Sequence, residues 1–379
     1  MRNPLVLSCS VATLLSLVAC GGDKPTPATG TSQAAPAPAP TPTPAVAKAP
    51  DAAAPTPVAS APAAAAQEPK PLPRVRIDYQ TVKTLFGKDP TSDEVDNPGT
   101  PEKVALGKAL YHEKHLSKNG NLSCASCHDL ANYGVDGLPT SPGSDGKNGE
   151  RNTPTSYNSF RQFRQFWDGR AATVEEQAML PVLNPIEHGI ADEAQLVAKL
   201  KEKPELVEGF KKAFPADAEP VSVNNFKLAV GAFERTLVTK SKFDAYLDGD
   251  QKALGNDEIY GLKAFIEVGC VTCHTTRLVG GHMFQKTGLL KPYGSKDEGR
   301  MQVTKSEADK HFFKVPALLN VEKTAPYFHD GKVATLEEAI TKMAEIQLDR
   351  KLTDEQVRGL VAFLKSLTGP LPAEFAAKK

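Results

Sequence analysis

The chain has 379 residues, with 45 Lys and Arg against 45 Asp and Glu, so its formal net charge is zero. Balanced charge without a long basic run gives no electrostatic support for nucleic-acid binding. About 300 residues follow residue 73, which is enough for two small domains. Beyond the first 20 residues, no apolar run is long enough to span a bilayer.

Residues 1–20 resemble a bacterial lipoprotein signal peptide. A basic start, Met1-Arg2, precedes an apolar run over 5–19 that is too short to span a bilayer comfortably. The run ends in Leu-Val-Ala-Cys-Gly, which resembles a lipobox in which Cys20 is acylated and becomes the mature N-terminus. An ordinary signal peptide cleaved nearby is the alternative. Both interpretations predict export, and the first predicts a lipid anchor on the periplasmic side of a Gram-negative cell envelope.

Residues 21–73 are almost entirely Ala, Pro, Thr, Gly and Ser. Such a segment has too little apolar side-chain area to form a core, and its prolines favour a semi-extended polyproline spacer. We therefore expect a disordered tether between the lipid anchor and a globular body that begins near Arg74.

Two Cys-x-x-Cys-His motifs, at Cys124–His128 and Cys270–His274, carry the strongest functional signal. The pattern is typical of c-type haem attachment, with two thioether bonds and the adjacent His as the proximal iron ligand. A zinc ribbon would place its Cys pairs roughly 15–20 residues apart, whereas these motifs start at residues 124 and 270. A thioredoxin-like pair would need only one motif. With Cys9 in the signal segment and Cys20 lipidated, no cysteine remains for a disulfide.

The hydrophobic spacing predicts a mainly helical body. Helix starts are expected at Thr100-Pro101, Thr173, Thr335 and Thr353, the last three from capping-box patterns. Apolar residues at helical spacing indicate further helices around 226–237 and 262–266. No convincing alternating strand is found, and the long loops 134–159 and 275–316 are rich in Gly and Pro.

The order of helix, haem motif, long loop and helix occurs twice. It predicts two tandem cytochrome-c-like domains with one haem each. We expect an N-terminal domain over 74–239 and a C-terminal domain over 240–379, because the boundary near Lys240 follows the helix that contains Phe233.

The body, from about Leu106 to Gly369, resembles the bacterial dihaem cytochrome c peroxidases in several stretches of sequence. The matching strings are 116–128, Asn-Thr-Pro-Thr at 152–155, Phe-Trp-Asp-Gly-Arg-Ala at 166–171, Asn-Pro-Ile-Glu at 184–187, 269–274 and Pro-Tyr-Phe-His-Asp-Gly at 326–331. The segment from Met343 to Arg350 and the final helix match in character and order. The resemblance implies reduction of hydrogen peroxide to water with electrons from small periplasmic donors.

The resemblance also implies roles for single residues. His128 would be the proximal ligand of the peroxidatic haem, held by Cys124 and Cys127, with Gln177 and Glu187 on its distal side. His274 and Met343 would be the axial ligands of the electron-transfer haem, held by Cys270 and Cys273. Trp167 matches the tryptophan between the haems. Asn152, Thr324 and Pro326 match a calcium site, the last two through backbone carbonyls. A homodimer is expected on the same basis.

Each of these residues could also have a purely structural role. A distal carboxylate can move a proton between the two oxygens of peroxide, yet Glu187 could simply cap the turn after Pro185, and Gln177 could be a solvated helix residue. A His/Met pair that includes Met343 would raise the reduction potential of the haem. However, Met343 shares an apolar helix face with Leu336 and Ile340, so it could simply pack in the core. Met283 and Met301 are fallback ligands. Trp167 could be a core aromatic beside Phe163.

One position departs from the family pattern. Well-studied members have a His sixteen residues after the first motif that blocks the peroxidatic iron in the oxidised state, and Ser144 stands there in this chain. We therefore expect the first haem to be five-coordinate or water-ligated even when oxidised, unless Tyr133 or a His from elsewhere folds in. His112, His115, His188, His282 and His311 are expected to be solvated or structural, and His329 and Asp330 to order a loop.

Two classes of function remain open from these residues: a peroxidase, or a dihaem electron carrier whose distal pocket does no chemistry. Related dihaem enzymes that oxidise protein side chains have a Tyr in place of the axial Met, so Met343 argues against that activity. The electron donor could be a monohaem cytochrome, a copper protein or a quinol-linked partner.

Overall fold

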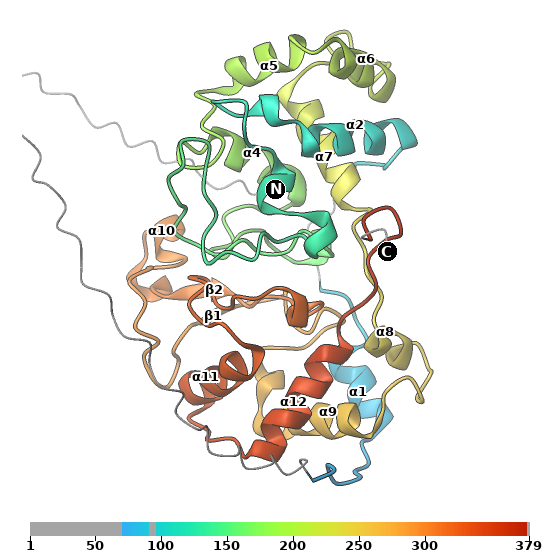
Figure 1. Ribbon diagram of the computed structural model, residues 1–379, viewed down its shortest axis with the longest axis vertical. Coiled ribbons are helices and arrows are strands. Elements are labelled where there is room, and N and C mark those ends of the chain that lie inside the picture. Colours follow the sequence, from blue (N-terminus) through green and yellow to red (C-terminus); the bar gives the residue numbers. More distant parts are fainter. Residues whose placement is uncertain (1–69, 91–95, 377–379) are drawn as a thin grey trace, which may run out of the picture. The chain divides into compact units, whose positions relative to one another are not determined.

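The computed structural model describes residues 70–90 and 96–376 (Figure 1). The predicted signal peptide, Cys20 and all of the predicted tether except 70–73 lie outside the described residues. The fold is mainly helical, as the sequence predicts. The helices are α1 Tyr79–Phe86, α2 Pro101–His112, α3 Cys124–Cys127, α4 Val174–Leu183, α5 Glu193–Lys201, α6 Pro204–Ala213, α7 Val223–Glu234, α8 Lys242–Leu247, α9 Asn256–Val268, α10 Met301–Thr304, α11 Leu336–Leu348 and α12 Asp354–Ser366.

Helix starts follow the predicted caps. Thr100, Thr173, Thr335 and Thr353 each accept a hydrogen bond from a backbone N–H three residues later. Only Thr353 forms the complete reciprocal capping box, with Gln356. At the start of α4, the Glu176 carboxylate instead accepts from the N–H of Ala172, one residue before the cap.

The helices gather around two main hydrophobic cores. One core joins α2, α4, α5, α6 and α7, and the other joins α1, α8, α9, α11 and α12. Figure 1 shows these two groups at opposite ends of the described part of the chain, with the β1–β2 region between them. The division at residue 240 remains a prediction. Helix α1 belongs to the core of the later helices, since Val82 and Phe86 pack with Phe243 and Phe265.

Each core contains one close helix crossing at a glycine. A Cβ on Gly107 of α2 would lie 2.0 Å from the carbonyl oxygen of Ala229 on α7. A Cβ on Gly261 of α9 would lie 1.8 Å from the carbonyl oxygen of Gly359 on α12. Only glycine allows the backbones to approach so closely. In both halves the helix that crosses in this way is the one that precedes a Cys-x-x-Cys-His motif.

The second long loop contains two short strands, although no strand is predicted from the sequence. Strand β1 Phe284–Lys286 pairs antiparallel with β2 Phe312–Lys314, with Gln285 opposite Phe313. Three residues are too few to show the two-residue periodicity from which a strand is predicted. None of the described helices is both long and apolar enough to cross a membrane.

Candidate functional site

The first motif is a single helical turn whose histidine is oriented by the backbone. Ser123 and Ser126 cap α3 reciprocally. The Nδ1 atom of His128 lies 3.3 Å from the carbonyl oxygen of Gly134, which leaves Nε2 for another partner. Burial lowers the pKa of His128, so the ring is held in the neutral form that ligates metals.

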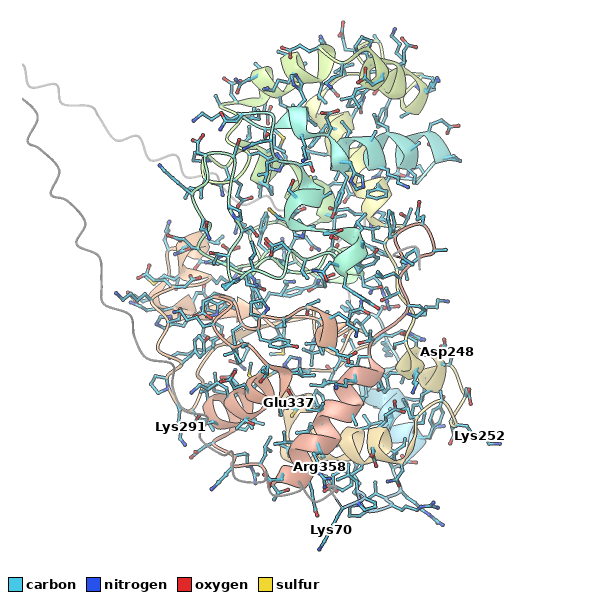
Figure 2. The ribbon with its side chains drawn as sticks, in the orientation of Figure 1. Lys70, Asp248, Lys252, Lys291, Glu337 and Arg358 are labelled. Atoms are coloured by element: carbon cyan, nitrogen blue, oxygen red, sulfur yellow. The ribbon has the colours of Figure 1, made fainter. Side chains whose placement is uncertain are left out.

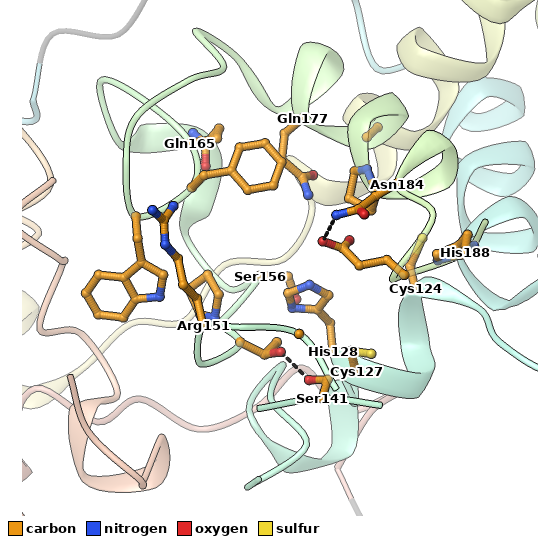
Figure 3. Close-up of a pocket in the computed structure, with 18 of the residues that line it drawn as sticks. Cys124, Cys127, His128, Ser141, Arg151, Ser156, Gln165, Gln177, Asn184 and His188 are labelled. Atoms are coloured by element: carbon orange, nitrogen blue, oxygen red, sulfur yellow. Dashed lines mark hydrogen bonds between the residues drawn. The ribbon is translucent and has the colours of Figure 1, made fainter. Parts of the chain in front are cut away.

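His128, Cys124 and Cys127 border a cavity of about 530 Å³. Gln177 and Glu187 line the same cavity, from α4 and from the turn that follows it. In Figure 3 the side chains of Gln177 and Asn184 reach into this cavity from one side, and His128 reaches in from the other. The structure therefore brings together the first motif and the two residues expected on the distal side.

The Glu187 carboxylate is held by the turn that carries it. Asn184 Oδ1 accepts from the N–H of Ile186, and Asn184 Nδ2 donates to Glu187 Oε1 at 2.8 Å. Asn184 therefore caps the turn, not Glu187. Burial raises the pKa of Glu187, opposed by the Arg170 charge and by the Asn184 hydrogen bond. No hydrogen bond to the Gln177 amide is found from residues 70–90 or 96–376, so this amide is available to a bound molecule.

The second motif repeats the orientation of the histidine. Gly269 ends α9 in the left-handed region, with φ 105°, and Cys270 follows directly. His274 Nδ1 lies 3.1 Å from the carbonyl oxygen of Val279, and burial lowers the pKa of His274 to about 4. A second cavity, of about 250 Å³, borders Cys270, Cys273 and His274. Met343 of α11 lines it, whereas Met283 and Met301 do not.

Comparison with known proteins identifies the family. Residues 101–252 match the family model described as di-haem cytochrome c peroxidase. The chain is 46% identical to a cytochrome c551 peroxidase of Nitrosomonas europaea over 73% of this chain and 82% of that protein. It is 40% identical to the cytochrome c551 peroxidase of Pseudomonas aeruginosa, covering 73% of this chain and 81% of that one.

The chain belongs to the di-haem cytochrome c peroxidase family. It is accordingly an oxidoreductase with peroxidase activity, and its family implies two haem cofactors. Among solved structures, the crystal structure of a MauG-like protein associated with microbial copper homeostasis aligns with a TM-score of 0.66 and 31% identity, covering 76% of this chain and 95% of that one.

Both cavities of this di-haem peroxidase fit a covalently held haem. Each borders two cysteines that form no disulfide, next to a half-buried imidazole. The second cavity also contains a buried cation, Lys314, which donates to Gln162 Oε1 and has no carboxylate partner among the described residues. Burial lowers the pKa of Lys314 to about 7. Because an unpaired buried ammonium is costly, an anionic group such as a haem propionate would complement it.

Ser144 is held by hydrogen bonds beside the first cavity, which the preceding residues Ser141, Pro142 and Gly143 line. The N–H of Ser144 donates to the carbonyl oxygen of Glu187 at 2.8 Å, and its hydroxyl donates to Asn121 Oδ1 at 2.8 Å. A Cβ on neighbouring Gly143 would lie 1.6 Å from the carbonyl oxygen of Ile186. Tyr133, considered as a substitute ligand, donates its hydroxyl to the carbonyl oxygen of Gly369. Neither Ser144 nor Tyr133 lines the cavity.

Trp167 lies in a wall that the two cavities share. Its indole N–H donates to the carbonyl oxygen of Asn152 at 2.9 Å, and its ring meets His329 edge-on at 6.3 Å between centroids. Residues 152–155 and 166–167 line both cavities. Trp167 is thus both a packed aromatic and a neighbour of both sites, so the two expectations for this residue are compatible.

The residues expected to bind calcium all border the second cavity, and Asn152 belongs to the shared wall. Asn152, Thr324 and Pro326 all line the second cavity. The Asn152 amide nitrogen donates to the carbonyl oxygen of Leu138 at 2.9 Å, so its oxygen faces away from that contact. Within the described residues no group of three or more His, Cys, Asp or Glu could hold a metal ion. Calcium at this position would therefore bind amide and carbonyl oxygens.

Several polar groups line the first cavity without having been assigned to it from the sequence. His188 is buried and lines it, with Nδ1 2.8 Å from the carbonyl oxygen of Leu116. Glu234 of α7 also lines it, and burial with the nearby Glu175 charge raises the pKa of Glu234 to about 8. In the sequence, the position of His188 directly after Glu187 is the one feature that could have indicated that it lines the cavity.

An ion network around the buried Asp168 joins the first cavity to the loop after β1. Arg151 binds Asp168 at 2.6 Å and both carboxylate oxygens of Asp297 at 2.6 and 2.9 Å. Arg170 pairs with the same Asp168 at 2.9 Å. Partners that are 17 and 146 residues apart give no local pattern from which the network could have been predicted.

Proposed function

We propose that this peroxidase reduces hydrogen peroxide to two molecules of water, using two protons and two electrons from a small redox protein. The observation that carries the proposal is that Gln177 and Glu187 line the same cavity as His128. Cys124, Cys127 and His128 would hold the haem that meets peroxide. Cys270, Cys273, His274 and Met343 would hold the other haem, with a propionate at Lys314.

When bound, the second haem supplies electrons collected from the donor protein, and the first supplies an iron with an open position for peroxide. The chain's own part is proton movement and positioning. One oxygen of the Glu187 carboxylate accepts the proton of one peroxide oxygen and returns it to the other, so that the O–O bond breaks and the second oxygen leaves as water. The remaining oxygen takes up the two electrons and two protons and leaves as the second water. The Gln177 amide donates a hydrogen bond that orients the peroxide. Trp167 provides a π-system in the shared wall.

Steady-state peroxide reduction by the full chain loaded with haem, with a reduced cytochrome c as donor, tests the proposal. We expect peroxide-dependent oxidation of the cytochrome at two molecules per peroxide. A protein that exchanges electrons with the cytochrome at an unchanged rate when peroxide is added would be an electron carrier and would contradict the proposal.

We further propose that this enzyme needs no prior reduction to become active. Ser144 stands where the blocking His is expected, and its hydrogen bonds hold it against Asn121 and the Glu187 backbone. Turnover should therefore be the same with and without prior half-reduction. The electron paramagnetic resonance spectrum of the oxidised protein should contain a high-spin signal from the first haem. A low-spin bis-His signal from that haem would refute the idea.

Three further assignments complete the proposal. Cys20 would carry a lipid that holds the enzyme on the periplasmic side of the envelope, and the intact mass of the membrane-extracted protein tests this through the added acyl groups.

One calcium ion would bind at Asn152, Thr324 and Pro326, so chelation should lower activity and added calcium should restore it. A homodimer is expected, and sedimentation of the purified enzyme as a monomer at all concentrations would exclude it.

A further inference from the structure

Two adjacent leucines form a conspicuous apolar surface feature next to the second cavity. The exposed fractions of Leu289 and Leu290 are 49% and 58%, the highest of the large apolar side chains in the described part of the chain. Single exposed apolar residues are common on protein surfaces, whereas adjacent ones form a patch that suggests a contact surface.

The backbone beneath these leucines is clamped to the end of α11. Gln347 Oε1 accepts from the N–H groups of Gly288 and Leu289 at 2.8 and 2.7 Å. The carbonyl oxygen of Ile346 accepts from the N–H groups of Leu290 and Lys291 at 3.0 and 3.1 Å. Gln347 Nε2 returns a hydrogen bond to the carbonyl oxygen of Lys286. A segment fixed in this way loses little conformational freedom when a partner binds it.

The patch is close to the second Cys-x-x-Cys-His motif. Gln285, the residue before Lys286, places its side-chain amide 3.8 Å from the sulfur of Cys273. Gln285, Thr287 and Gln347 all line the second cavity. A partner seated on the leucines would therefore lie near Cys273, which would hold the haem of this motif.

The two segments that form the patch, 286–291 and 342–351, carry five basic and two acidic residues. Both acidic residues are paired, Asp349 with Lys291 and Glu345 with Lys342. Lys286, Arg350 and Lys351 are exposed and have no carboxylate partner among the described residues. Figure 2 shows Lys291 at the edge of the molecule beside α11. The surface is thus an apolar centre with an excess of positive charge around it, in a chain whose net charge is zero.

We propose that Leu289 and Leu290, together with the exposed Lys286, Arg350 and Lys351 of the same two segments, form the docking surface for the electron donor. The donor would be a small redox protein with an apolar surface around its cofactor edge and carboxylates at the rim. The inference rests on the proposed function, because it assigns electron entry to the second site. The apolar centre supplies affinity, and the charges orient the encounter and make its rate sensitive to salt.

The charge requirement is tested with two forms of one donor: a basic mitochondrial-type cytochrome c, and the same protein with its lysines succinylated to make it acidic. Both are used in reduced form with the haem-loaded full chain. We expect a higher kcat/KM for the succinylated form at low ionic strength, and a decline toward the value of the native form as salt rises. A preference for the basic form, or no preference, overturns the proposal.

The apolar centre is tested with the double variant Leu289→Ser/Leu290→Ser. We expect roughly a tenfold higher KM for the succinylated cytochrome, the effect of losing a modest hot spot, while turnover with a small-molecule reductant and the haem absorption spectrum stay unchanged. Leu138→Ser, at a side chain that is 44% exposed, is the matched control and should behave as the wild type.

Other outcomes of this experiment are distinguishable. An unchanged KM in the double variant overturns the docking surface while leaving peroxide reduction intact. Absence of peroxide turnover in the wild type, even with the small-molecule reductant, overturns the proposed function itself. Sedimentation that shows a wild-type dimer and a monomeric double variant assigns the patch to a second copy of this chain and also overturns the proposal.

Discussion

The two cavities border the same motif but have different walls. The first is lined by many ionisable side chains: Arg151, Asp168, Arg170, Glu187, His188 and Glu234. The second is lined mostly by apolar side chains, among them Phe265, Leu318, Ile340 and Leu360, with Met343. Reduction of peroxide requires protons as well as electrons, whereas electron transfer alone requires a closed, weakly polar surrounding. The difference supports the proposal that proton chemistry takes place in the first cavity.

The motifs themselves do not create this difference. In both, the histidine Nδ1 lies near a backbone carbonyl oxygen, that of Gly134 or that of Val279. In both, desolvation lowers the pKa of the imidazole. The asymmetry comes from elements outside the motifs, namely α4 and its turn in one half and α11 in the other. Substitutions in those elements are the way to test it.

The largest effect is expected from Glu187→Gln. The amide cannot accept the peroxide proton, so kcat should fall by about 10²–10⁴-fold, while the reduction potentials of both haems change little. Stopped-flow mixing with peroxide and steady-state rates with a reduced cytochrome measure the loss. Glu193→Gln, at an exposed position in the first turn of α5, is the control and should keep wild-type rates. Retention of most activity by Glu187→Gln would assign the proton transfer to another group, such as His188 or Glu234.

The pH profile provides an independent check on the same group. Burial raises the pKa of Glu187 above its usual 4.5. The ionised form is the one that accepts a proton, so kcat/KM for peroxide should fall as the pH drops through the raised pKa. This acid limb should be missing from the residual activity of Glu187→Gln. An identical limb in both proteins would mean that a different residue titrates.

Met343→Ala should have the next largest effect, which should fall on the haem of the second cavity. Loss of the thioether ligand should lower the reduction potential of the second haem by on the order of 0.1 V, a fraction of the roughly 0.8 V that axial ligands span. The absorption band from methionine sulfur to ferric iron should disappear, and donor-dependent turnover should fall. Met301→Ala is the matched control, because Met301 does not line the cavity. A persistent band in Met343→Ala would exclude Met343 as the ligand.

Local patterns predicted much of this molecule. The haem motifs, the capped helix starts and the family strings all depend on residues close together in sequence, and His128, Gln177 and Glu187 do line one cavity. The spacing of apolar residues predicts that Val104, Ala105 and Leu110 lie on the apolar side of α2. This prediction was partly wrong, because Leu110 is buried whereas Ala105 is exposed and its neighbour Leu106 is buried instead. A helix face is about 100° wide, so an error of one residue is enough to move a side chain to solvent.

Features made by distant partners could not be predicted. Arg151 meets Asp297 across 146 residues, α1 packs on helices that follow residue 240, and Lys314 stands in a strand of only three residues. No periodicity or motif marks a lysine that becomes fully buried, because lysine is almost always exposed. Such a residue stands out only after the fold has placed it next to a cavity.

Lys314 is therefore the basis of the last and smallest expected effect. If its ammonium pairs with a propionate of the second haem, Lys314→Gln removes a cation beside a redox centre and favours the oxidised state. An interaction on the order of 1 kcal/mol corresponds to a fall of tens of millivolts for one electron, measured by spectroelectrochemical titration of that haem. Lys305→Gln, at an exposed lysine, should leave the potential unchanged. A fall in the reduction potential of the first haem instead of the second would mean that Lys314 acts across the wall that the two cavities share. The backbone N–H of Lys314 donates a hydrogen bond to the carbonyl oxygen of Trp167 in that wall. The two cavities would then be less well separated than the difference between their walls suggests.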